Sequence, residues 1–318
     1  MSKWIVKAFL QRSFSLFPNP ERINRLFQKY LTGKDKLDDV KFQNKLMHAQ
    51  DHLKYLKTFA PGKDTSALKC LELGTGQFPI VPIYYYLHGI NYIYSIDVVP
   101  FLTIDRIKNT FDYFVYFEKH HPEKFKKYLS KVIPERWQEL LSWQNQINEQ
   151  TTVEEVISKF KTTVVIQDAR KTDFKEGEFD FITSNNTFEH IYPEILEGIL
   201  KEFYRILSTG GVMSHFIDMT DHFAHFDKKI NVYNYLKFSP RTWKLIDNEI
   251  LPQSRLRLKD YKALYNKLNI PINDTVIWEH NPELVKEVKL HSSWKNYSLE
   301  ELAIVHVYLV SIKNQNFF

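Results

Sequence analysis

The sequence contains little cysteine, little glycine and no long apolar run, and each shortage excludes a class of protein. Its single cysteine, Cys70, excludes an intramolecular disulfide framework and is typical of a reducing compartment, so we predict a cytoplasmic protein. No uninterrupted apolar stretch approaches the ~18 residues of a membrane-spanning helix. With 9 glycines, 13 prolines and 43% apolar residues, the composition is typical of a globular chain rather than a disordered one.

The length of 318 residues is enough for one large or two small domains with a substantial core. The formal net charge is +5 and the isoelectric point is near 8.9. This excess of basic residues is mild and spread along the chain, so we expect no nucleic-acid partner. Residues 1–17 form a basic amphipathic segment. It either lies on a membrane surface or docks as a helix on the domain, and docking is favoured.

The stretch 69–79 organises the chain. An apolar run that contains Glu72 ends in a Gly-Thr-Gly turn at 74–76, and a helix-compatible segment follows. This order predicts a strand, a tight turn and a helix whose N-terminus faces a ligand. The glycines permit a sharp turn and a close approach to that ligand. A dinucleotide-binding turn would carry a small residue where Pro79 stands, which disfavours a hydride-transfer enzyme.

The carboxylate two residues before this turn, Glu72, resembles motif I of the class I S-adenosylmethionine-dependent methyltransferases, in which an acid precedes Gly-x-Gly-x-Gly. The chain departs from that motif at Phe78, which stands in place of the third glycine. Asp97 ends the next predicted strand, 25 residues after Glu72, near the ~20 expected of an acid that binds ribose hydroxyls. The stretch 179–191, an acid-led strand followed by Ser-Asn-Asn and Phe-Glu-His-Ile, is similar to the family's fourth strand and the helix after it.

A third resemblance concerns the cofactor. The Asp168-Ala169 pair, after a predicted strand at 163–166, resembles the family's adenine-binding motif, in which an acid accepts from the exocyclic amine. The family resemblance implies S-adenosylmethionine as the cofactor. The residues that it assigns to cofactor binding are Glu72, Gly74, Thr75, Gly76, Gln77, Asp97, Asp168, Ala169, Asn185 and Asn186.

The resemblance covers about residues 67–218 and the final strands. It implies an α/β fold, a doubly wound, seven-stranded and mostly parallel sheet with one antiparallel strand. We expect an N-terminal helical segment at 1–60 and a methyltransferase domain at 61–318. From Asp97 to Asp168 there are 71 residues, where a βαβ unit needs only ~30, so a helical insertion is predicted at about 101–160. We expect this insertion to cover the ligand crevice, with most of its aromatic residues forming its own core.

Polar residues follow the predicted fifth strand, at 212–218, in an unusual density. They are His215, Asp218, Asp221, His222, His225 and Asp227. The candidates for acid–base catalysis are His190, His215, Asp218 and His222, because groups on this rim converge on the crevice. Their spacing matches no standard zinc motif, so no metal is predicted. The alternative is that the histidines brace the loop.

The expected function is therefore S-adenosylmethionine-dependent O-methylation of a small molecule or a glycan precursor. The alternative is a non-catalytic protein of methyltransferase fold that binds a partner through its helical additions. Arg255 and Arg257 could clamp a phosphate or carboxylate, but solvated side chains are the favoured interpretation of this pair. The sequence indicates neither the acceptor nor an oligomeric state.

Overall fold

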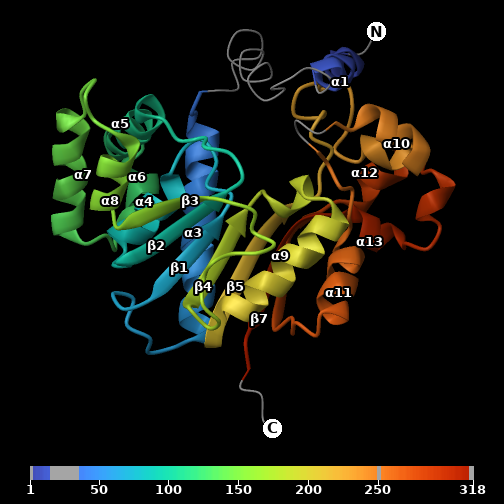
Figure 1. Cartoon of the computed structure of the whole chain (residues 1–318). Coiled ribbons are helices and arrows are strands. Elements are labelled where there is room, and N and C mark those ends of the chain that lie inside the picture. Colours follow the sequence, from blue (N-terminus) through green and yellow to red (C-terminus); the bar gives the residue numbers. More distant parts are fainter. Residues whose placement is uncertain (1–2, 15–35, 249–251, 315–318) are drawn as a thin grey trace.

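A seven-stranded sheet forms the centre of the molecule in a computed structural model that describes residues 3–14, 36–248 and 252–314 (Figure 1). The strand order is β3-β2-β1-β4-β5-β7-β6, and only β7 runs antiparallel to its neighbours within this sheet. The strands are β1 (Lys69–Leu73), β2 (Tyr92–Asp97), β3 (Thr162–Ile166), β4 (Phe179–Asn185), β5 (Leu207–Asp218), β6 (Asp274–His280) and β7 (Ile304–Ile312). The predicted fold class is confirmed. The strand order reverses between β1 and β4, so a ligand crevice is expected at their carboxyl ends.

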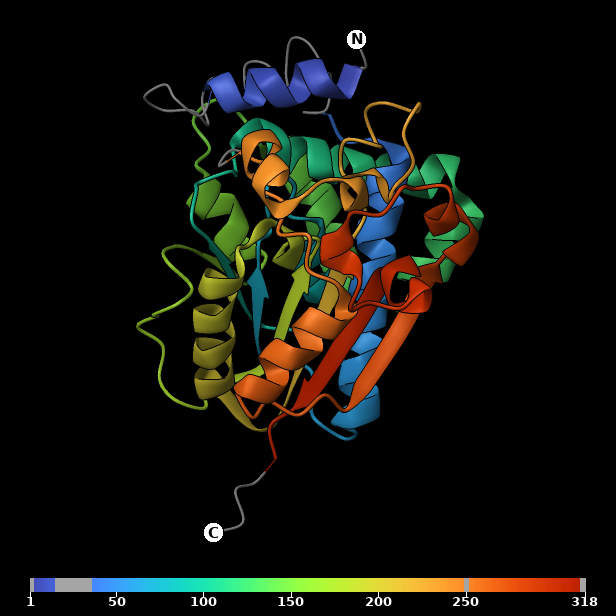
Figure 2. The same cartoon turned by 90° about the vertical axis from the view of Figure 1, so that its right-hand side faces the viewer.

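Helices cover both faces of the sheet (Figures 1 and 2). Helices α3 and α4 pack on one face with the helices of the insertion, and α9 and α11 pack on the other. The α-helices are α1 (Lys3–Phe14), α3 (Asp39–Phe59), α4 (Ile80–Leu87), α5 (Ile104–His120), α6 (Pro122–Leu129), α7 (Pro134–Gln146), α8 (Val153–Lys159), α9 (Pro193–Ile206), α10 (Pro240–Ile246), α11 (Leu258–Lys267), α12 (Pro282–Lys286) and α13 (Leu299–Ala303).

Helix α3 lies across β4 and β5 and reaches their carboxyl ends. Its N-terminus is capped by Asp38, whose Oδ1 accepts a hydrogen bond from the Lys41 N–H at 2.9 Å. Its fully buried residues Phe42 and Leu46 anchor it to the core. Helix α3 lies in the segment 1–60 that was expected to be helical, and residues 15–35 of that segment lie outside the described residues.

The insertion consists of α5, α6, α7 and α8, close to the predicted boundaries. Its residues Phe111, Phe114 and Phe117 are fully buried in the same core cluster as α3 and α4. The rings of Phe42 and Phe114 meet edge to face, with centroids 4.9 Å apart. The aromatic residues therefore build core, as expected, but that core is shared with the main sheet. The expected cover is not found, because the cavity described below is lined by α3 and not by residues 101–160.

Helix α1 docks on the loop after β5. The Trp4 N–H donates to Oδ2 of Asp227 at 3.2 Å, and the Trp4 ring lies 5.6 Å from the rings of both Phe223 and Phe238. This contact agrees with the favoured interpretation of residues 1–17. Of the helices in the described ranges, none is long and apolar enough to cross a membrane.

The interpretation of Arg257 as a solvated side chain is wrong. Its side chain is fully buried, and its guanidinium donates to the carbonyls of Met219 and Leu302, each at 2.7 Å, and to that of Ile304. Arg255 is half-buried and donates to a carbonyl of the preceding loop. Both arginines therefore donate to backbone carbonyls of the protein instead of lying in solvent.

Candidate active site

The turn after β1 depends on glycine. Gly74 has φ +78° and Gly76 has φ +72°, in the left-handed region that side chains with a Cβ rarely adopt. A Cβ on Gly74 would lie 2.5 Å from Oγ1 of Thr187, whereas a Cβ on Gly76 would meet nothing closer than 4.0 Å. The two glycines therefore differ: Gly74 is needed for packing against the β4 loop, and Gly76 leaves space open above the turn.

Glu72 is a fully buried carboxyl beneath this turn. Its Oε2 accepts a hydrogen bond from Oγ1 of Thr75 at 2.5 Å, and its Oε1 has no hydrogen-bond partner among the described residues. Burial raises the pKa of Glu72 to about 7, although the nearby cation of Lys45 opposes the shift. Glu72 is thus an acceptor with capacity for a further donor.

Asp97, at the carboxyl end of β2, joins the same turn. Its Oδ2 accepts from the Gly76 N–H at 3.1 Å. Burial raises its pKa to about 6, against the opposing effects of that hydrogen bond and of Lys45. The structure therefore brings Glu72, Asp97 and the glycine turn together, as the spacing of these residues predicted.

A cavity of about 360 Å³ lies over the turn and under α3. Its volume is within the range of small-molecule sites, ~300–1,000 Å³. The lining residues are Leu37, Lys41, Asn44, Lys45, His48, Gly74, Thr75, Gly76, Gln77, Phe78, Ile80, Asn185 and Asn186. Six of the ten residues assigned to cofactor binding line this one cavity. We call it the cofactor cavity.

Lys45 of α3 was not foreseen from the sequence. Its Nζ lies 3.4 Å from the carbonyl oxygen of Asn185. Burial lowers its pKa, and the charges of Glu72, Glu189 and Asp97 oppose that shift. A lysine beside Leu46, on the buried side of a helix, is the one signal that could have indicated a functional cation.

Asn185 and Asn186 lie at the end of β4. Oδ1 of Asn185 accepts from Nε2 of His52 at 3.0 Å, and Asn186 adopts φ +52° beside the cavity.

Asp168 and Ala169, in contrast, lie away from the cavity. Asp168 is half-exposed and bonded to Arg170, with Nε–Oδ2 at 2.8 Å, and Ala169 is buried. Neither of these two lines the cofactor cavity.

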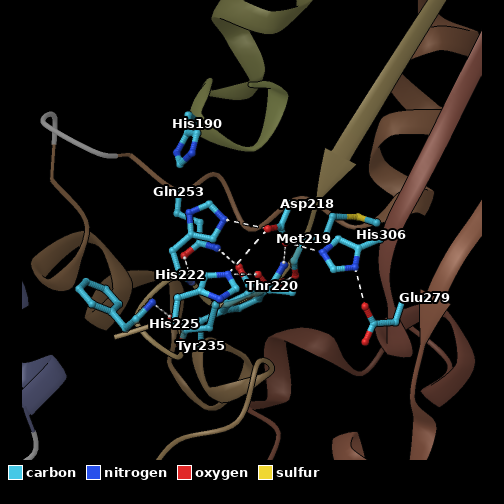
Figure 3. A network of polar contacts seen from close by, with 12 residues as sticks. His190, Asp218, Met219, Thr220, His222, His225, Tyr235, Gln253, Glu279 and His306 are labelled. Atoms are coloured by element: carbon cyan, nitrogen blue, oxygen red, sulfur yellow. Dashed lines mark hydrogen bonds and ion pairs between the residues drawn. The ribbon is translucent and has the colours of Figure 1, made fainter. Parts of the chain in front are cut away.

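A second polar group lies past the carboxyl ends of β4 and β5, and Figure 3 shows its contacts. We call it the histidine cluster, which comprises Glu189, His190, Asp218, His222 and His225. Nε2 of His222 lies 3.7 Å and Nε2 of His225 lies 3.8 Å from Oδ2 of Asp218. The rings of His190 and His222 are 4.8 Å apart. The loops after two neighbouring parallel strands meet here.

Contacts outside the cluster fix its orientation. Oδ1 of Asp218 accepts from the Thr220 N–H at 2.8 Å and faces Nε2 of His306 at 3.4 Å. His306 in turn contacts Oε2 of Glu279 through Nδ1 at 2.7 Å. Burial opposes ionisation of Asp218, but the surrounding imidazoles outweigh it and hold the pKa of Asp218 well below its usual range. Asp218 is therefore a permanent carboxylate.

His190 has a defined tautomer, because Nδ1 lies 2.8 Å from the carbonyl oxygen of Pro252 and must donate to it. Nε2 therefore carries the lone pair. Burial lowers the pKa of His190 despite that hydrogen bond, so the ring is neutral at physiological pH. A neutral imidazole with a free lone pair can accept a proton or bind a metal ion.

His215 does not join the cluster. It is fully buried on the opposite face of the sheet, where Nδ1 contacts Oγ of Ser184 at 2.8 Å and the ring stacks on Phe188. Residues three apart in a strand point to opposite faces, so Asp218 and His215 cannot reach the same site. His190, Asp218 and His222 do converge. Glu189 and His306 were missed, although His306 pairs with Asp218 in the β5–β7 register.

Comparisons with known proteins agree with this architecture. A sequence-family model described as a methyltransferase domain matches residues 136–214. No curated protein gave a significant match.

Three solved structures are among those similar to this chain. Geranyl diphosphate C-methyltransferase from Streptomyces coelicolor is 9% identical with a TM-score of 0.46, over 84% of this chain and 78% of that one. An S-adenosylmethionine-dependent methyltransferase from Methanosarcina mazei is 13% identical with a TM-score of 0.43, over 78% and 92%. A structure from Galdieria sulphuraria, described as a sarcosine dimethylglycine methyltransferase, is 14% identical with a TM-score of 0.44, over 85% of this chain and 86% of that one.

Proposed function

We propose that this chain is a class I S-adenosylmethionine-dependent methyltransferase and that it methylates a hydroxyl group of a small molecule or a glycan precursor. The proposal concerns the acceptor and the residues that act on it. The neighbouring positions of the cofactor cavity and the histidine cluster support it.

The residues of the first site fit the cofactor. Gly76 leaves open space above the turn, Glu72 has an unused acceptor oxygen, and Asp97 offers a carboxylate at the end of β2. These groups, with Asn185 and Asn186, would hold S-adenosylmethionine. When bound, that cofactor supplies an electrophilic methyl group on a sulfonium. The part of the chain is to bind it, to align the acceptor and to remove a proton.

One observation carries the assignment of the acceptor site. Asn185 and Asn186 line the cofactor cavity at the end of β4, Glu189 follows them in the same loop, and Asp218 ends the adjacent parallel strand β5. The cluster and the cavity therefore lie at the same edge of the sheet. An acceptor between the two would meet imidazoles and carboxylates, which are groups that bind and deprotonate a hydroxyl.

His222 is the proposed proton acceptor. Methylation of a hydroxyl oxygen releases one proton, and a neutral imidazole accepts protons near physiological pH. Oδ2 of Asp218 lies 3.7 Å from Nε2 of His222, so its permanent charge stabilises the imidazolium that forms. A positioned base of this kind contributes ~10²- to 10⁴-fold to the rate.

The test is His222→Ala, assayed by transfer of labelled methyl groups from S-adenosylmethionine to a panel of small hydroxyl acceptors. We expect turnover to fall by at least ~100-fold, with cofactor affinity by calorimetry within about threefold of wild type. His120→Ala, an exposed change in α5, is the matched control and should leave both values unchanged. Normal turnover of His222→Ala would refute its role as a base. Wild-type protein that binds the cofactor but methylates nothing would favour the non-catalytic alternative.

A further inference from the structure

Glu189 is the least satisfied charged group in the described part of the chain. Its side chain is 2% exposed, and neither carboxylate oxygen has a hydrogen-bond partner among the described residues. A buried carboxyl without donors is costly, and such groups are normally paired or coordinate a metal ion.

The nearest potential partners of Glu189 are imidazole nitrogens. One carboxylate oxygen of Glu189 and one ring nitrogen from each of His190 and His222 lie within 4.8 Å of one another. One oxygen of Asp218 and one nitrogen from each of His222 and His225 form a second such triad. His222 belongs to both triads, so the two triads adjoin at this residue.

Outer contacts also restrict which donor atoms are available. The bond to the Pro252 carbonyl occupies Nδ1 of His190, and Thr220 and His306 occupy Oδ1 of Asp218. This leaves Nε2 of His190 and Oδ2 of Asp218, and Oδ2 faces Nε2 of His222. Nε2 of His225 also contacts Oγ1 of Thr220 at 3.1 Å. Outer contacts of this kind hold the ligands of metal sites in place.

The separations are close to those around an ion. Adjacent ligands at ~2.1 Å from a six-coordinate metal ion lie roughly 3.0 Å apart. Oδ2 of Asp218 lies 3.7 Å from Nε2 of His222 and 3.8 Å from Nε2 of His225, so these pairs would contract by about 0.7 to 0.8 Å around an ion. His225 is half-exposed, which leaves a path for an ion from solvent.

We infer that the histidine cluster binds one divalent transition-metal ion, with His222 as the central ligand and Glu189, His190, Asp218 and His225 as the other donors. Imidazole nitrogens with carboxylate oxygens suit zinc, manganese, iron or cobalt, whereas magnesium and calcium prefer oxygen alone. The ligands come from the loops after two different strands. This arrangement explains why the spacing along one loop predicted no metal.

The role of this ion in catalysis rests on the proposed function, whereas the binding of the ion to the cluster does not. A divalent ion at the cluster would bind the acceptor oxygen and lower the pKa of its hydroxyl, as metal ions do for bound water. With the ion bound, His222 would act as a ligand instead of the proton acceptor, and the proton of the acceptor hydroxyl would leave to solvent. The ion would also neutralise Glu189, which has no cation bonded to it in the described residues.

The test uses Co²⁺ as the probe, because its visible absorption reports coordination by nitrogen and oxygen ligands. Full-length, tag-free protein is treated with a chelator, dialysed and titrated with CoCl₂ without cofactor or acceptor. We expect one saturable equivalent in the wild type. His222→Ala should weaken Co²⁺ binding by at least ~10-fold, and His120→Ala should bind as the wild type does.

Glu189→Gln is a second variant that keeps the side-chain shape, in case His222→Ala does not fold. It should also weaken Co²⁺ binding by at least ~10-fold. Absence of saturable Co²⁺ binding by the wild type, or wild-type affinity in either folded variant, overturns the inference. Chelator-resistant methyl transfer without Co²⁺ binding would overturn the metal site and retain the proposed function. Co²⁺ binding without methyl transfer to any acceptor would retain the metal site and overturn the proposed function.

Discussion

Asp218 of the histidine cluster differs from Glu72 and Asp97 beside the cofactor cavity in the direction of its pKa shift. In the cofactor cavity region, burial raises the pKa of Glu72 to about 7 and that of Asp97 to about 6, with Lys45 as the nearby cation. In the histidine cluster, imidazoles hold the pKa of Asp218 well below its usual range. Glu72 and Asp97 therefore have few hydrogen-bond donors around them until a bound ligand supplies more. The histidine cluster maintains a fixed negative charge through its own histidines.

The largest expected effect tests the first half of this contrast. The folded pKa of Glu72, about 7, lies above its ordinary value of 4.5, so wild-type stability falls as the pH rises from 4.5 through 7. At ~1.4 kcal/mol per pH unit this loss amounts to about 3 kcal/mol. The Glu72→Gln variant lacks this pH-dependent loss. In urea unfolding, the stability of the variant relative to wild type should therefore improve by about 3 kcal/mol between pH 4.5 and pH 8.

The same unfolding experiment on Asp218→Asn tests the other half of the contrast, because the effect of pH on the stability of this variant relative to wild type should have the opposite sign. The folded pKa of Asp218 is depressed, so its stabilisation is present above the ordinary pKa near 3.8 and is lost as the pH falls below it. The chelator-treated Asp218→Asn protein should therefore be less stable than wild type at pH 7. If both variants changed stability in the same direction with pH, the contrast between the regions would be wrong.

A smaller effect separates the two glycines of the turn. Gly74→Ala should destabilise the protein by about 2 kcal/mol, because left-handed backbone and the clash with Thr187 add. Gly76→Ala has the same backbone strain without a clash and should cost about 1 kcal/mol. Thermal or urea unfolding measures both. Thr187→Ala in the Gly74→Ala background should recover the difference, and no recovery would exclude the clash as its cause.

The last prediction concerns ligand binding and not stability. Asp97→Ala should weaken S-adenosylmethionine binding by at least ~1.5 kcal/mol, or more than tenfold, because hydrogen bonds to a carboxylate are lost. Titration calorimetry measures this directly. Asp64→Ala is the matched control, since this exposed aspartate precedes the amino end of β1, at the opposite edge of the sheet. Unchanged affinity in Asp97→Ala would remove Asp97 from the cofactor site.

The sequence predicted the sheet well because the strands are short apolar runs whose ends carry clear signals. β2 ends at Asp97 as expected, and the Gly-Thr-Gly turn follows β1 directly. Glu72 and Asp97 could be assigned to one site since parallel neighbouring strands end at the same edge. These are local patterns combined with one rule of topology.

The remaining parts of the site depend on contacts that no local pattern encodes. Lys45 reaches the cavity because α3 crosses the ends of β4 and β5, and Arg257 is buried because distant carbonyls surround it. The misassignment of His215 has a different cause. Strand alternation was available from the sequence and would have excluded it once Asp218 was chosen.

The burial of Arg257 has a consequence for the movement of ligands. Its guanidinium ties Met219, at the base of the loop that carries the histidine cluster, to Leu302 of α13. The planar guanidinium holds both carbonyls in one fixed geometry, so it joins the two segments rigidly. We expect the loop base to stay fixed while acceptor and product exchange on the side of α1, where Trp4 contacts Asp227. Substitutions of Trp4 should then change the rate of product release, while the sheet and the base of the loop keep their positions.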